Sequence, residues 1–368
     1  MTVTKAAIVR EKGGPFRIEE IHVEEPRLDE VAVRIAGTGV CHTDLLARDQ
    51  RLPPGAPAVL GHEGSGVVTA VGAAVTSVAV GDRVILAPMS CGHCRGCRTG
   101  HPMHCSSFLG VNLMGGRRDG STAYRDATGG ELRGHFFGQS SFSTEAVVHE
   151  RSVVRIPEDC ADVPLELLGP MGCGLQTGAG TVLNSLKPSA GSSIVVIGAG
   201  AVGMAAIMAA GVVSAGLIVA VDLNDNRLEL ARELGATHAF RADSASLVED
   251  VIALTGRGVD FSVDAVGRPE TVRTAVAVLG IGGTAALVGS AGAGQETSLG
   301  ISQLFGRTVK GVVEGDCVPA LLIPELIRLH RAGRFPFDKL IRTYGFEDIE
   351  QAVEDAEQGR TVKPVLVV

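Results

Sequence analysis

Hydrophobic and polar residues alternate in two different ways along the chain. Early short runs such as Val31-Ala-Val-Arg-Ile35 alternate in side-chain polarity and are interrupted by turn residues such as Gly13-Gly14-Pro15. This period of two predicts half-buried β-strands, and we expect further strands over residues 64–71 and 82–86. In the second half, short apolar runs are followed by helix-like segments instead. The pattern therefore predicts a β-rich first half and a βα-alternating second half.

The βα alternation of the second half predicts a doubly wound parallel sheet, as in Rossmann folds. Expected strands cover residues 193–198, 219–222, 260–264 and 284–288, and expected helices cover 202–210 and 228–234. After about residue 313 the chain should return to the first domain through helices 320–331 and 349–357. We accordingly expect a catalytic domain formed by residues 1–174 and 314–368, and a dinucleotide-binding domain formed by 175–313.

A glycine-rich turn follows the first strand of the second half. It reads Gly198-Ala-Gly200-Ala-Val202-Gly203, with Asp222 about 20 residues further on. Glycines let a pyrophosphate approach the backbone, and the N-terminus of the next helix offers it positive potential. The alternative is a turn that only packs. Asp222 would accept bonds from ribose hydroxyls and repel a 2′-phosphate, which favours NAD, whereas Arg227 nearby could accommodate that phosphate.

Composition narrows the class of partner. The chain has 368 residues, a formal net charge of -8 and no Trp, which argues against nucleic acid or an anionic membrane as the main partner. No signal-peptide pattern and no apolar run of membrane-spanning length is evident, so we expect a soluble cytoplasmic protein. Eight cysteines are many for that compartment, and five of them fall within the first 105 residues.

Four of these cysteines are closely spaced, at Cys91, Cys94, Cys97 and Cys105. Four thiolates in one short glycine-containing loop can surround a single tetrahedral zinc ion, which predicts a structural zinc site. The alternatives are disulfides, which the cytoplasm disfavours, and an iron–sulfur cluster. Cys160 and Cys317 lie apart from any such group and are expected to be packing residues.

A second, looser group of ligands contains Cys41 in Cys41-His-Thr-Asp44 and His62 in Gly61-His-Glu63. Asp44 and Glu63 supply carboxylates that could orient these two ligands. A catalytic zinc site uses three protein ligands and keeps one position open, so one ligand is still missing. Cys173, in the segment Gly169–Thr177 between the two halves, is the candidate for it.

The order of these motifs resembles that of zinc-dependent medium-chain alcohol dehydrogenases over essentially the whole chain. Within that family, Gly138-Gln-Ser-Ser-Phe-Ser143 and Gly172-Cys173-Gly174 are most similar to bacterial aryl-alcohol (benzyl-alcohol) dehydrogenases. The resemblance implies a GroES-like catalytic domain joined to a Rossmann domain. It also implies one catalytic zinc, one structural zinc and NAD.

The resemblance further implies roles for single residues. The catalytic zinc ligands would be Cys41, His62 and Cys173, with Glu63 behind the metal and Asp44 orienting His62. Thr43 would be the first proton acceptor. The implied cofactor contacts, besides the glycine-rich turn, Asp222 and Arg227, are His42, Thr177, Val266, Val288 and Lys363. Many members have a histidine at the end of the proton relay where this chain has Leu46, which leaves Arg48 or His42 to replace it.

The predicted reaction is oxidation of a primary aromatic or allylic alcohol to its aldehyde, with hydride transfer to NAD. Ala87 favours a wide pocket, because relatives that prefer small alcohols often carry a bulky aromatic there. The alternatives are a zinc dehydrogenase of another alcohol class, such as a terpenol like geraniol, an aliphatic alcohol or a polyol, and a zinc-free quinone reductase-like or structural relative. The expected partners are the alcohol and aldehyde and other copies of the chain, as a homodimer or homotetramer.

Overall fold

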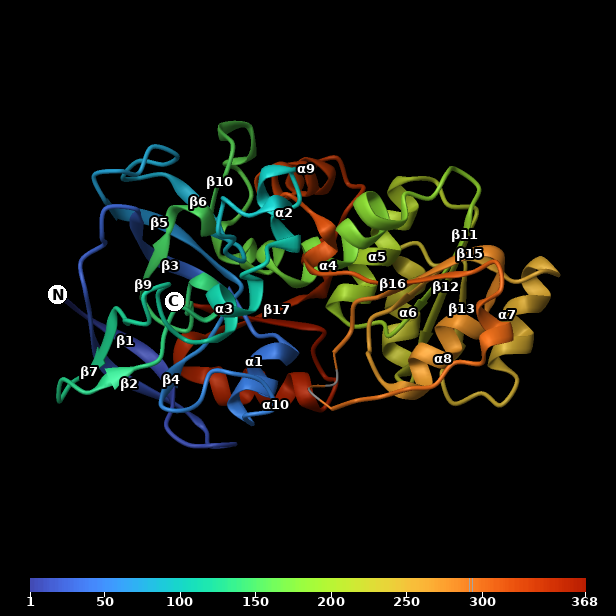
Figure 1. Ribbon diagram of the computed structural model, residues 1–368, viewed down its shortest axis with the longest axis horizontal. Helices are drawn as coiled ribbons and strands as arrows, with labels where there is room; N and C mark the ends of the chain where they lie inside the picture. Colours follow the sequence, from blue (N-terminus) through green and yellow to red (C-terminus); the bar gives the residue numbers. More distant parts are fainter. Residues whose placement is uncertain (291, 293) are drawn as a thin grey trace. The chain divides into compact units, whose positions relative to one another are not determined.

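The structure, a computed structural model, describes residues 1–290, 292 and 294–368. The contacts within it divide the chain into two compact units (Figure 1). The first unit comprises Met1–Cys173, Val318–Arg328 and Asp338–Val368, and the second comprises Gly174–Cys317 and Leu329–Phe337. Among the described helices, none has the length and apolar character that crossing a membrane requires.

The first unit is built from two β-sheets, as its alternating sequence predicts. One sheet has the strand order β4-β1-β2-β7-β8, and the other has the order β10-β6-β5-β3-β18-β17, with β9 also paired to β3. The strands are β1 Thr2–Val9, β2 Phe16–Val23, β3 Glu30–Gly39, β4 Ala58–Val59, β5 Gly64–Val71, β6 Arg83–Leu86, β7 Tyr124–Asp126, β8 Glu131–Leu132, β9 Glu145–His149, β10 Val153–Arg155, β17 Ile341–Gly345 and β18 Lys363–Val367.

Helices of the first unit are short or lie near the C-terminus. They are α1 His42–Arg48, α2 Arg95–Arg98, α3 Phe108–Leu113, most of α9 Pro319–Arg331, and α10 Ile349–Glu357. The last strand, β18, pairs antiparallel with β3, so residues near the end of the chain complete a sheet begun near its start. This pairing brings Lys363 into the core of the first unit, where it is 3% exposed.

The second unit contains a parallel sheet of six strands in the order β13-β12-β11-β14-β15-β16, the arrangement of a Rossmann fold. The strands are β11 Ser193–Ile197, β12 Leu217–Asp222, β13 His238–Arg241, β14 Val259–Asp264, β15 Leu279–Leu287 and β16 Thr308–Gly311. Every residue of β11 is buried, which is why its sequence is almost wholly apolar. The fold predicted from the βα alternation is thereby confirmed.

Helices accompany this sheet along the chain (Figure 1). They are α4 Gly174–Gly180, which continues as the π-helix η7 Thr181–Leu186, α5 Ala201–Val212, α6 Asp225–Glu233, α7 Leu247–Thr255 and α8 Pro269–Ala277. The short 3₁₀ helix η9 (Glu314–Asp316) packs against α4, because Gln176 Nε2 and Thr177 Oγ1 each donate to Glu314 Oε2 at 3.1 Å. These bonds group Glu314–Cys317 with the second unit, although the sequence pattern assigned that segment to the first domain.

Candidate metal and cofactor sites

The first site is organised around the start of helix α1. Cys41 is the N-cap residue, and Asp44 in the first turn accepts a bond from the Cys41 backbone N–H through Oδ2 at 3.0 Å. The other oxygen of Asp44 accepts from Gly61 N at 3.1 Å and lies 2.8 Å from Nδ1 of His62. One fully buried carboxylate therefore joins the two segments that carry Cys41 and His62, and Asp44 contacts His62 as the family resemblance implies.

Four candidate ligands converge at this place. Four ligand atoms lie within 4.8 Å of one another here. They belong to Cys41, His62, Glu63 and Cys173. His62 Nε2 is buried and makes no hydrogen bond with any described residue, which is costly unless another group occupies that position. Two sulfurs and one imidazole nitrogen are a donor set that zinc prefers. The residues therefore fit a catalytic zinc ion with Glu63 beside it.

The charges at this site also favour a bound cation. A hydrogen bond with Cys173, and the charges of Lys363 and His62, lower the pKa of the Cys41 thiol well below 9.0 against the cost of burial. Burial opposes an imidazolium at His62, but the negative charges of Asp44 and Cys41 outweigh it and raise the pKa of His62. A thiolate and a carboxylate thus draw positive charge to a buried position, which a metal ion can supply.

Glu63 has a partner that sequence reasoning did not assign to it. Lys363 Nζ donates to both oxygens of Glu63, at 2.9 and 2.8 Å, and to the carbonyl of Val40 at 3.1 Å. These bonds account for the three N–H groups of the ammonium, which was expected to contact a cofactor pyrophosphate. That contact stays a prediction, while the structure gives Lys363 a second role as the counter-charge of a carboxylate at the metal site.

The expected proton acceptor lies next to the first ligand. Thr43 Oγ1 is 3.9 Å from Cys41 Sγ, and Thr43 lies in the first turn of α1. Leu46 is 2% exposed and offers no polar atom for a relay. Arg48 bonds to Asp49 at 2.8 Å and to Glu357 at 3.0 Å, and its pKa is raised by these partners despite partial burial, so it stays protonated. His42 is exposed and remains the candidate for the end of the relay.

The second site is the four-cysteine loop. Cys94 Sγ and Cys97 Sγ are 3.6 Å apart, and Cys91 Sγ and Cys97 Sγ are 4.0 Å apart. These separations exclude a disulfide, whose sulfurs are about 2.0 Å apart. They bracket the distance of about 3.8 Å between sulfurs around one tetrahedral zinc. With the Cys105 sulfur also within 4.8 Å of the others, the four sulfurs fit around a single ion and lie too close together to surround a cluster of several iron atoms.

The glycine-rich turn of the second unit joins strand β11 to helix α5. Gly198 has a φ of +92°, and Gly200 is the N-cap of α5. A Cβ at Gly203 would lie 1.8 Å from the Gly198 carbonyl oxygen, so only glycine permits this close packing. Asp222 ends β12 and accepts from Ala199 N at 2.7 Å and from Asn224 N at 2.9 Å. The turn and the carboxylate thus adjoin, as a dinucleotide site requires.

The other predicted cofactor residues of the second unit occupy different elements. Arg227 lies on α6, and its buried Nε makes no hydrogen bond with any described residue. Val266 follows strand β14 and Val288 follows strand β15, so both lie at the C-terminal ends of parallel strands. The backbone N–H of each donates to Asp264, that of Val266 to the side chain and that of Val288 to the carbonyl. Thr177 lies in α4, where its hydroxyl donates to Glu314, so in this structure that hydroxyl serves the packing of η9.

Comparison with known proteins decides the family. Residues 27–158 match the model of the alcohol dehydrogenase GroES-like domain, and residues 201–329 match that of zinc-binding dehydrogenases. Geraniol dehydrogenase of Castellaniella defragrans is 43% identical over 99% of this chain and 97% of its own length. This chain belongs to the zinc-dependent medium-chain alcohol dehydrogenases.

Solved structures of alcohol dehydrogenases resemble this chain over their whole length. Benzyl alcohol dehydrogenase of Acinetobacter calcoaceticus is 44% identical, with a TM-score of 0.96 and full coverage of both chains. A zinc-binding domain protein of Burkholderia ambifaria is 47% identical, with a TM-score of 0.97 and coverage of 100% and 99%. The predicted alcohol dehydrogenase family, its two zinc sites and its nicotinamide cofactor agree with these findings. The finer prediction of an aryl-alcohol enzyme stays open, because one of these relatives is named for geraniol and another for benzyl alcohol.

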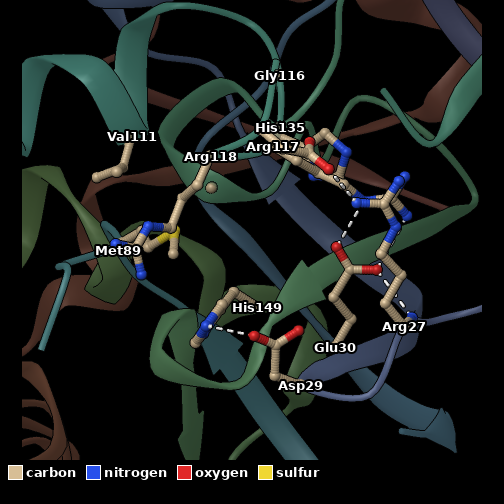
Figure 2. Close-up of a pocket in the computed structure, with 12 residues that line it drawn as sticks. Arg27, Asp29, Glu30, Met89, Val111, Gly116, Arg117, Arg118, His135 and His149 are labelled. Carbon is tan, nitrogen blue, oxygen red and sulfur yellow. Dashed lines mark hydrogen bonds and ion pairs between the residues drawn. The ribbon is translucent and has the colours of Figure 1, made fainter. Parts of the chain in front are cut away.

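The dehydrogenase also has a pocket whose described lining contains none of its candidate metal ligands. The pocket lies in the first unit and has a volume of about 180 Å³. Figure 2 shows the charged side chains that line it. Arg117 binds Glu30 through Nε and Nη2, at 2.7 and 2.9 Å, and His149 Nε2 lies 3.3 Å from Asp29. Because these charges largely neutralise one another, the pocket has no evident preference for a charged ligand. None of the residues predicted for metal, substrate or cofactor is among the described residues that line it.

Sequence reasoning missed two residues at the catalytic centre of the dehydrogenase. Phe137 stacks on the His62 ring, with the ring centroids 4.6 Å apart and the planes inclined by 27°. Gln139 is fully buried, donates to the His62 carbonyl at 2.9 Å and accepts from Gly64 N at 3.0 Å. Both follow β8 by only a few residues. Gln139 falls within the family-like motif that begins at Gly138, whereas Phe137 precedes that motif and had no sequence signal.

Proposed function

We propose that this dehydrogenase oxidises primary aromatic or allylic alcohols to aldehydes and transfers the hydride to NAD. The observation that carries the proposal is the convergence of Cys41, His62 and Cys173, with the buried and unsatisfied Nε2 of His62, in a chain of this family. A zinc ion held there supplies Lewis acidity, which lowers the pKa of an alcohol hydroxyl. In this proposal Thr43 would accept the hydroxyl proton, and its Oγ1 lies 3.9 Å from Cys41 Sγ.

The substrate class is supported by the chemistry that two relatives share. Geraniol and benzyl alcohol both carry an sp² carbon next to the carbinol carbon, and both are too large for a site narrowed by an aromatic side chain. Ala87, which follows strand β6, adds little bulk at the position where such a side chain would stand. An alcohol with an adjacent sp² carbon also loses hydride more easily, because the aldehyde formed is conjugated. A terpenol such as geraniol thus falls within the proposed class as an allylic alcohol.

The preference for NAD is supported by Asp222. Its carboxylate stands at the end of β12, where a ribose hydroxyl would bond to it and a 2′-phosphate would be repelled. Arg227 opposes this preference only in part, because a guanidinium can also bond to ribose hydroxyls. We therefore expect NAD to be preferred and NADP to be used weakly.

A panel of alcohols tests the proposal. We expect kcat/KM with NAD for benzyl alcohol, cinnamyl alcohol and geraniol to exceed that for ethanol and sorbitol by about 100-fold or more, because a larger apolar body contributes binding in the transition state. Equal values for ethanol and benzyl alcohol would reject the substrate class. Activity with sorbitol alone would favour the polyol alternative.

Metal content tests the site itself. We expect two zinc ions per chain in the wild type and one in Cys173→Ala, which should lose turnover but keep NAD binding. Cys160→Ala is the matched control, because Cys160 is likewise a buried cysteine of the first unit but lies outside both ligand groups. It should keep two zinc ions. A Cys173→Ala protein that retains two zinc ions and full activity would remove Cys173 from the ligand set.

We further propose that the protein forms a homodimer or homotetramer through the edge of its parallel sheet. Strand β16 is the last strand of that sheet, and the nearby Ile281, Ile301 and Phe305 are 83%, 78% and 68% exposed. An open strand edge with large apolar side chains around it is typical of an association surface. Light scattering should give the mass of a dimer or tetramer, and Phe305→Asp should lower it. A monomeric wild type would refute the proposal.

A further inference from the structure

The loop that carries Phe137 has an unusual backbone. His135, Phe137 and Ser140 all adopt left-handed conformations, with φ values of 56°, 51° and 56°. For residues with a Cβ each such conformation costs on the order of 1 kcal/mol or more. Three of them within six residues persist only if the surrounding structure holds the loop in place.

Hydrogen bonds hold this loop against the segment that carries His62. Ser140 Oγ donates to the Val59 carbonyl at 2.7 Å, and Ser141 N donates to the Gly61 carbonyl at 2.9 Å. The Gln139 side chain bridges the His62 carbonyl and Gly64 N, as described above. The strained loop and residues 59–64 are therefore joined along their length.

The side chains of the loop enclose the imidazole of His62. Phe137 covers one face of the ring in a stacked contact, and Phe136 meets it edge-on, with centroids 5.5 Å apart and planes at 88°. Asp44 bonds to Nδ1 and so holds one point of the ring. A bond at one ring atom leaves the tilt of the ring plane free, whereas a flat ring stacked on it restricts that tilt.

We propose that Phe137 is a positioning residue that aims Nε2 of His62 at the catalytic metal. The inference rests on the proposed role of His62 as a ligand. An imidazole binds a metal through a lone pair in the plane of its ring, so a change in tilt weakens the bond. Residues that orient a ligand commonly affect metal affinity by about 10–100-fold.

Phe137→Leu tests this role, because leucine keeps the apolar bulk and the same backbone cost but removes the flat ring. The first measurement is the release of zinc to EDTA from the purified full-length protein. We expect the variant to release one zinc about ten times faster than the wild type, and the second zinc, in the four-cysteine loop, at the wild-type rate. The second measurement is the visible absorption of Co²⁺ bound in place of the catalytic zinc, which should shift.

Phe16→Leu is the matched control. Phe16 belongs to the same hydrophobic cluster and is 3% exposed, but its described ring contact is with Phe142. It should release both zinc ions at wild-type rates and leave the Co²⁺ spectrum unchanged. The role of Phe137 would be overturned if both variants released the catalytic zinc faster than the wild type, or if neither did. A wild type that holds zinc only in the four-cysteine loop would instead reject the proposed function, and this inference would fall with it.

Discussion

The ammonium of Lys363 bonds to both carboxylate oxygens of Glu63, a residue 300 positions earlier in the chain. Both side chains are buried, at 3% and 0% exposure. Burial disfavours the ammonium, but the Glu63 carboxylate outweighs this effect and raises the pKa of Lys363, which stays charged. The pair places a neutralised carboxylate beside the ligands Cys41, His62 and Cys173.

Replacing Lys363 alone should destabilise the folded protein more than replacing both Lys363 and Glu63. Lys363→Met leaves a buried carboxylate without its partner, and we expect it to lower the free energy of unfolding by about 3–5 kcal/mol. The double variant Glu63→Gln/Lys363→Met should recover most of that loss, because no charge remains buried. Urea unfolding of the zinc-bound proteins measures both values. Equal losses in the single and double variants would show that the charge of Glu63 is not the cause.

The backbone before Cys173 should tolerate no side chain. A Cβ at Gly172 would lie 1.9 Å from the carbonyl oxygen of Leu86, a rigid backbone atom. We expect Gly172→Ala to cost about 1–3 kcal/mol of stability and to lower the zinc content by displacing Cys173. Gly110→Ala is the control, because a Cβ there meets no atom within 4 Å. It should be neutral or slightly stabilising in a thermal melt, since alanine favours the helix.

His135 should make the protein sensitive to acid. Burial, together with the charge of Arg117, lowers the pKa of His135 to about 4, and its Nε2 accepts a bond from Ala123 N. In the unfolded chain His135 binds a proton near pH 6.5, whereas in the folded chain it does so only near pH 4. Its contribution to the free energy of unfolding is therefore fully present above pH 6.5 and is lost as the pH falls from 6.5 towards 4. A shift of this size corresponds to about 3 kcal/mol.

His135→Asn tests this effect, because asparagine tolerates a left-handed backbone, can accept the same bond and does not titrate. The free energy of unfolding should fall less steeply for the variant than for the wild type between pH 6.5 and 4. Parallel curves would mean that other groups, such as the metal ligands, account for the whole loss.

Asp222 should control the choice of dinucleotide. Asp222→Gly removes the carboxylate that repels a 2′-phosphate while Arg227 remains, so we expect the ratio of kcat/KM for NADP to that for NAD to rise about tenfold or more. Asp225→Ala is the control, because Asp225 is a neighbouring carboxylate engaged with Arg241 at 2.9 Å. It should leave the ratio unchanged. A ratio that is also unchanged in Asp222→Gly would remove Asp222 from the ribose site.

Features encoded by neighbouring residues could be predicted from the sequence. The four cysteines fall within 15 residues, so their spacing predicted one shared metal site, and the structure brings the four sulfurs within 4.8 Å of one another. The glycine-rich turn is local in the same sense, because strand, turn and helix follow one another. The parallel character of the second sheet followed from the βα alternation, whereas its strand order came only from the structure.

Contacts between distant residues were decided only by the tertiary structure. The pairing of β18 with β3 brings Lys363 to Glu63, and no local pattern encodes that register. The stacking of Phe137 on His62 depends on a left-handed backbone held by bonds to residues 59–64, which a sequence pattern does not reveal. The sequence by itself thus determined which residues could bind metal and cofactor. The folded chain determined which side chains hold those ligands in place, because that depends on how distant segments pack.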